Sequence, residues 1–168
     1  MKILLFITFP IIYTIFVFYN GIIDFNMTGL MNNPSTKIIA ILLSLIWTLT
    51  IIYLLYKALK KTILTKQKEK IITLCILMLL TVLLPYDSTG SLLSQLHLFF
   101  AIASIIYLHI LLYYLKDINQ FITSFYCACL VLSGFFILTY SSITGLSEWI
   151  FAIGLWISLF LINKKYLH

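Results

Sequence analysis

The chain is poor in charged residues and contains no arginine. Only 10% of its 168 residues are charged, whereas about a quarter is usual in soluble domains. Eleven lysines against five acids give a formal charge of +6. Arginine supplies the planar fork that pairs with phosphates and base edges, so its absence argues against nucleic-acid recognition. The excess of positive charge therefore needs another explanation.

Cysteine is scarce, and complete catalytic motifs are absent. The three cysteines (Cys75, Cys127 and Cys129) fall inside apolar segments, and an odd number there excludes a disulfide framework. We interpret them as small apolar side chains. The sequence contains no G-x-S-x-G, H-E-x-x-H, C-x-x-C or Walker loop, which are the motifs that announce common hydrolases, redox sites and nucleotide sites. It predicts no metal centre and no cofactor.

Apolar residues are abundant, at 62% of the chain. A soluble domain of this length leaves much of its surface in water and could not bury so many apolar side chains. We therefore predict an all-α bundle of six transmembrane helices, forming one domain over residues 1–168. The predicted spans are residues 3–19, 38–56, 71–85, 96–115, 121–140 and 149–162.

The lysines predict how this bundle is oriented. In a six-span topology ten of them share the side of both termini, and only Lys37 faces the other side. Cytoplasmic loops carry the excess of lysine in membrane proteins. We therefore expect a multi-pass protein of the cell (plasma) membrane with both termini in the cytoplasm. The ten lysines are Lys2, Lys57, Lys60, Lys61, Lys66, Lys68, Lys70, Lys116, Lys164 and Lys165.

Six of these lysines lie in the connector between the second and third predicted spans, from Lys57 to Lys70. One interpretation is that they only fix the orientation. The other is that they also bind anionic lipid headgroups, at about 1 kcal/mol for each lysine near the membrane surface. Membrane lipids are the partners that the sequence suggests.

Three ionisable residues are predicted to lie near the outer boundary of the membrane. Asp87 ends the third span, His97 enters the fourth and Glu148 opens the sixth. A carboxylate beside an imidazole can orient a general base or complete a metal site. His97 shares one helix face with Ala101 and Ser104, because their spacing is i, i+4, i+7. We expect this small, polar face to point into the bundle, toward the end of the third span that carries Asp87. The candidate ligand-binding residues are Asp87, His97, Ser104 and Glu148.

Each of these residues also has a plainer interpretation. Asp87 is part of a polar turn, and His97 can satisfy one buried carbonyl. Glu148 can complement the positive end of the last helix, with Ser147 as its N-cap. For His109 we expect a hydrogen bond to Tyr113 or to neighbouring backbone.

Two segments carry a resemblance to a known family. Leu84-Pro85-Tyr86-Asp87, followed by Leu96-His97 and Ala101, resembles the "P-x-D … L-H … A" signature of the bacterial membrane family catalogued as domain of unknown function 998. Gly145 to Ile150, followed by Leu155-Trp156, is similar to its "G-L-x-E-R-I … L-W" segment, although Trp149 stands where the family has arginine. This six-helix family is grouped distantly with damage-regulated autophagy modulator-like proteins. The resemblance implies that Asp87, His97 and Glu148 are positions typical of the family, and it implies no particular activity.

Three functions remain open at this point. The first is a non-enzymatic protein that binds a lipid or small amphiphile through an outer pocket of Asp87, His97 and Glu148. The second is an intramembrane enzyme acting on a lipid headgroup or ester, with His97 as base or metal ligand, Asp87 orienting it and Glu148 as a further candidate. The third is a small-solute transporter or transporter subunit, which is disfavoured because few polar residues lie at the middle of the spans.

Overall fold

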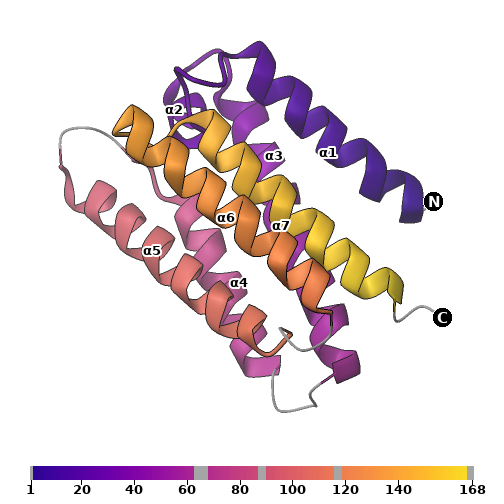
Figure 1. The fold of residues 1–168 in the computed structure, drawn as a ribbon. Coiled ribbons are helices and arrows are strands. Elements are labelled where there is room, and N and C mark those ends of the chain that lie inside the picture. The colour runs from indigo at the N-terminus through magenta and orange to yellow at the C-terminus, as the bar shows by residue number, and fades with distance from the viewer. Residues whose placement is uncertain (1, 63–67, 87–89, 116–118, 166–168) are drawn as a thin grey trace.

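The computed structural model describes residues 2–62, 68–86, 90–115 and 119–165, and these residues form helices and connections without any strand (Figure 1). Six of the helices are long, and one, α2, is a short helix in the first connection. The seven are α1 (Lys2–Tyr19), α2 (Met27–Asn32), α3 (Lys37–Thr62), α4 (Lys68–Leu83), α5 (Leu92–Tyr113), α6 (Gln120–Tyr140) and α7 (Gly145–Lys165).

Four of the described helices are long and apolar enough to cross a membrane. They cover Lys37–Leu59, Leu92–Tyr113, Gln120–Tyr140 and Gly145–Lys164. Large apolar side chains cover their outer surfaces; Ile38 is 73% exposed and Leu138 is 80% exposed. Such a surface is unfavourable in water and suits contact with lipid. The protein is thus a helical membrane protein.

The six long helices run alternately in opposite directions, and α1 begins at the same end of the bundle at which α7 finishes (Figure 1). We call this the terminal end. The opposite end, which we call the α2 end, contains α2 together with the starts of α5 and α7. Helix α3 packs against α2, α4 and α7, while α5 packs along α4 and α6 packs along α7. The pairing of α6 with α7 is close because Gly154 faces Cys129, whose Cβ would lie only 2.5 Å from a Cβ at that glycine.

The buried core is divided between the two ends. The larger cluster lies toward the terminal end and joins α3, α4, α5, α6 and α7 through side chains such as Leu55, Leu74, Leu111 and Leu159. A smaller cluster lies toward the α2 end and joins α1, α2, α3 and α7. It consists of Tyr13, Val17, Met27, Leu30, Ala40 and Ala152.

Helix α2 lies between the first two predicted spans, 3–19 and 38–56, where the sequence predicts no helix. Asn26 is its N-cap, and its side-chain oxygen accepts a hydrogen bond from the Gly29 N–H at 2.7 Å. The hydroxyl of Thr36 then donates to the Leu30 carbonyl at 2.7 Å, which closes the turn into α3. Polar residues in this segment therefore serve as helix caps and turn formers.

The start of the last helix is a second correction. Helix α7 begins at Gly145, so Ser147 lies inside its first turn, and the predicted N-cap role of Ser147 is wrong. Thr144 precedes the helix and forms a reciprocal capping pair with Ser147. The Ser147 N–H donates to the Thr144 hydroxyl at 3.3 Å, and the Thr144 N–H donates to the Ser147 hydroxyl at 3.1 Å.

Candidate functional site

His97 lies in the second turn of α5, at the α2 end, and it points into the bundle as expected. Its side chain is only 6% exposed. Nδ1 lies 2.9 Å from the carbonyl oxygen of Leu84, the residue that follows α4. Because a carbonyl oxygen only accepts hydrogen bonds, Nδ1 carries the hydrogen and donates it. The plainer interpretation, in which the imidazole satisfies one buried carbonyl, is therefore confirmed.

The second ring nitrogen of His97, Nε2, differs from Nδ1 in its hydrogen bonding. Within the described residues, Nε2 has no hydrogen-bond partner, and in the neutral ring it is an acceptor. The ring packs beside that of Tyr86, with 5.5 Å between centroids. Ser104 is buried on the same helix, and its hydroxyl donates to the Ala101 carbonyl at 2.8 Å. Asp87 lies outside the described residues.

Glu148 lies in the first turn of α7 and has a backbone partner. Its Oε2 accepts a hydrogen bond at 2.6 Å from the N–H of Met27, which is the first residue of α2. The next residue, Trp149, donates from Nε1 to the Thr14 hydroxyl on α1 at 2.9 Å. The Leu146 N–H donates to the Ile22 carbonyl at 2.7 Å. The segment from Gly145 to Trp149 therefore holds the connection between α1 and α2.

Helix α2 lies between the two candidate groups. Its first residue, Met27, bonds Glu148, and its last residue, Asn32, donates from its side chain to the Tyr86 carbonyl, next to His97. A helix of six residues is about 9 Å long. Glu148 thus bonds the first residue of α2, whereas His97 lies beside Tyr86, whose carbonyl bonds the last residue of α2. The described ranges also contain no group of three His, Cys, Asp or Glu side chains that could hold a metal ion.

A polar pair that was not predicted joins α5 to α6. The Tyr126 hydroxyl donates to Nε2 of His109 at 2.9 Å, while Nδ1 of His109 donates to the Ile105 carbonyl at 2.7 Å. Phe151 of α7 packs beside both rings, with centroid distances of 6.3 Å to His109 and 6.4 Å to Tyr126. The expectation of a backbone partner for His109 is confirmed, and its second partner is Tyr126. Both ring nitrogens are therefore occupied.

Along the outer surface of α5 lies a shallow and widely open groove of about 530 Å³, and all of its lining residues belong to this one helix and its C-cap, Tyr114. Three isoleucines form its apolar wall, and each is about half exposed. His109 adds no free polar atom, because both of its nitrogens are bonded. The groove becomes polar only at the terminal end, at two tyrosines. Its lining residues are Ile105, Ile106, His109, Ile110, Tyr113 and Tyr114.

A lysine lies at the polar end of this groove. Nζ of Lys70, in the first turn of α4, donates to the Tyr114 hydroxyl at 3.3 Å and lies 5.0 Å from the centre of that ring. Lys70 is one of the six connector lysines, of which the structure describes only two side chains, Lys57 and Lys70, both half-buried. In the sequence, the groove corresponds to isoleucines that are followed by two tyrosines. The pattern of a single helix does not show which lysine lies beside those tyrosines.

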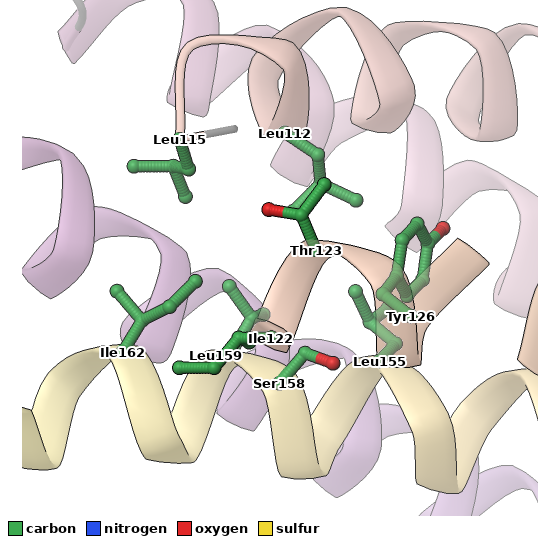
Figure 2. A pocket seen from close by; sticks show the side chains of 9 residues that line it. All are labelled: Leu112, Leu115, Ile122, Thr123, Tyr126, Leu155, Ser158, Leu159 and Ile162. Carbon is green, nitrogen blue, oxygen red and sulfur yellow. The ribbon is translucent and has the colours of Figure 1, made fainter. Parts of the chain in front are cut away.

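A second hollow lies inside the terminal end, among α5, α6 and α7 (Figure 2). Its volume is about 40 Å³, enough for a water molecule but not for a lipid chain. Three residues with hydroxyls line it, and all three hydroxyls are bonded. Ser158 donates to the Gly154 carbonyl at 2.8 Å, Thr123 donates to the Asn119 carbonyl at 3.2 Å, and Tyr126 donates to His109. We interpret this cavity as a packing defect rather than a ligand site.

Comparison of the chain with models of protein families, with curated proteins and with solved structures finds no match to any of them.

Proposed function

We propose that this chain is a six-pass protein of the cell membrane, with both termini in the cytoplasm. Ten of the eleven lysines belong to the side of the termini when six spans are counted, and this asymmetry is what orients membrane proteins. The alternating directions of the six long helices are compatible with that topology (Figure 1). Helices α1 and α4 are then the two shorter spans. The resemblance to the family of domain of unknown function 998 is part of the same proposal.

The function that we infer is the binding of a lipid or small amphiphile on the outer surface of α5. The open groove carries this inference, because its half-exposed isoleucines form an apolar surface that an acyl chain can cover. From Ile105 to Tyr114 the helix rises roughly 14 Å, close to the ~15 Å depth of one leaflet of the hydrocarbon core. An acyl chain can follow the isoleucines, with its polar group at the tyrosines.

Two isoleucines of α5 allow a matched test. Ile106 lines the groove and is 57% exposed, whereas Ile102 lies one turn away, outside it, and is 58% exposed. We expect Ile106→Trp to fill the groove and to lower several-fold the phospholipid retained after purification in detergent, measured by native mass spectrometry. Ile102→Trp should leave the retained lipid at the level of the unaltered protein.

Equal lipid retention by both variants and by the unaltered protein would show that the groove is not the site. An equal loss in both variants would point instead to a general effect of a bulky ring on the surface of α5. Circular dichroism and the unfolding temperature of each variant establish that the bundle is intact.

A second candidate function rests on Nε2 of His97, which has no hydrogen-bond partner among the residues that the structure describes. In this reading His97 accepts a proton from water that attacks the ester of an outer-leaflet lipid, and the products are a carboxylic acid and an alcohol. His97→Asn keeps an N–H donor near the position of Nδ1 and removes Nε2. Release of fatty acid from phospholipid vesicles by the unaltered protein, but not by this variant, would support the enzyme. No release by either would remove this candidate.

A further inference from the structure

The groove on α5 becomes polar at its terminal end, where tyrosines and a lysine lie. The inference drawn from this end rests on the lipid-binding function proposed above. We propose that the bound molecule is a phospholipid of net negative charge from the cytoplasmic leaflet. Its headgroup phosphate is held by Lys70 and Tyr114 while one acyl chain lies along Ile110, Ile106 and Ile105.

The charge of Lys70 is available to such a headgroup. Its partner in the described part of the chain is the ring and hydroxyl of Tyr114, at 5.0 Å from the ring centre and 3.3 Å from the hydroxyl oxygen. Neither of these contacts neutralises the ammonium group. The neighbouring Glu69 is exposed, and no ion pair joins it to Lys70 in the part of the chain that the structure describes. An ammonium group without a carboxylate partner can donate a charge-assisted hydrogen bond to a phosphate oxygen.

The position of Lys70 in its helix adds to this effect. It is the third residue of α4, a helix of 16 residues, and the N–H groups of a first turn have no partners within their own helix. The positive end of the α4 dipole therefore lies at the same place as the lysine. A phosphate here would interact with the ammonium group, the Tyr114 hydroxyl and the partial charge of the helix end.

The groove also has the polarity of a lipid in the cytoplasmic leaflet. Tyr113 is the last residue of α5 and Lys70 is in the first turn of α4, and these two helix ends lie at the terminal end of the bundle (Figure 1). The isoleucines of the groove lie earlier in α5, toward its middle. Tyrosine rings are enriched at the headgroup level of membranes. A lysine can bury its stem against apolar surface while its ammonium group reaches that same level. The headgroup and the chain of one lipid thus meet matching surfaces along a single helix.

The experiment compares two lipids on the full-length protein. Spin-labelled phosphatidylglycerol and spin-labelled phosphatidylcholine are added in turn to the protein in phosphatidylcholine nanodiscs, and electron paramagnetic resonance gives their relative association. We expect the unaltered protein to prefer phosphatidylglycerol several-fold. Lys70→Gln should abolish this preference while association of phosphatidylcholine persists, and Lys70→Arg should retain it.

Lys57 provides the control for charge in general. It belongs to the same connector and is half-buried like Lys70, but among the described residues no tyrosine forms a hydrogen bond or cation–π contact with it. Lys57→Gln should therefore keep the preference for phosphatidylglycerol. Removal of the nearby acid in Glu69→Gln should increase the preference, because it takes away a negative charge one residue from Lys70.

The outcomes separate this proposal from the lipid-binding function on which it rests. If Lys70→Gln keeps the full preference, or if Lys57→Gln loses as much, the headgroup assignment is wrong, whatever Ile106→Trp does. If Ile106→Trp leaves association of both lipids unchanged, the groove itself is not a lipid site. Loss of both lipids in Ile106→Trp, together with loss of the preference alone in Lys70→Gln, supports the two proposals.

Discussion

At the scale of single residues, Gly145 and Gly134 differ in the room that they leave for a side chain. A Cβ on Gly145 would lie 2.5 Å from the Phe25 carbonyl oxygen and 2.9 Å from that of Ile22, and both are backbone atoms that cannot rotate away. A Cβ on Gly134, inside α6, would meet nothing within 4 Å. The close approach of these two carbonyl oxygens is a physical reason for a glycine at position 145.

This contrast predicts opposite effects of the same substitution. Gly145→Ala should destabilise the protein by about 1–3 kcal/mol, since the start of α7 must move away from the α1–α2 connection. Gly134→Ala should stabilise it by up to about 1 kcal/mol, because alanine is the better helix former. Denaturant unfolding in detergent, followed by tryptophan fluorescence, measures both. Equal stability of the two variants would contradict the close approach at Gly145.

At the scale of the helices, α2 depends on contacts outside itself. A helix of six residues is too short to be stable alone in water. Its first N–H is held by Glu148, which lies 121 residues later in the chain. Its Met27 and Leu30 side chains are buried against α1, α3 and α7. The carboxylate of Glu148 therefore acts as a helix cap supplied by another helix.

This dependence predicts a graded response at Glu148. Glu148→Ala leaves the Met27 N–H without its acceptor and should lower the local stability of α2 by about 1–3 kcal/mol. Glu148→Gln keeps a carbonyl oxygen and should lose less. Hydrogen–deuterium exchange should become faster in residues 27–32 and stay unchanged in the terminal half of α5. Unchanged exchange in both variants would mean that the cap is not needed, and would favour the prediction that Glu148 is a ligand group.

The helices also show how far the sequence could be interpreted. Long apolar runs are local, so the spans at 96–115 and 121–140 correspond closely to α5 and α6. The inward direction of His97 was predicted for the same reason, from the pattern of a single helix. The partner of Glu148 was not predicted, because a hydrogen bond between residues 121 apart leaves no local trace. Likewise, α2 is held by distant side chains rather than by a periodic pattern of its own.

At the scale of the whole molecule, the proposed six-pass topology makes a simple prediction. Reporter tags placed after residues 30, 64 and 90 should be found outside, inside and outside the cytoplasm, in that order, because the lysine-rich connector stays on the cytoplasmic side. Fusions to alkaline phosphatase and to green fluorescent protein report whether each position lies outside or inside the cytoplasm. Any other order would overturn the topology and would move the groove to the other leaflet.

The bond between Glu148 and Met27 also constrains when the molecule can be completed during synthesis. A ribosome that adds about 5–20 residues per second needs roughly 6–24 s to cover the 121 residues between these partners. Throughout that interval the first helix lacks its contacts with α7, including the Trp149–Thr14 hydrogen bond. A nascent chain arrested before residue 145 should therefore carry a loosely attached N-terminal helix, exposed to chaperones and membrane proteases until the final helix enters the bilayer.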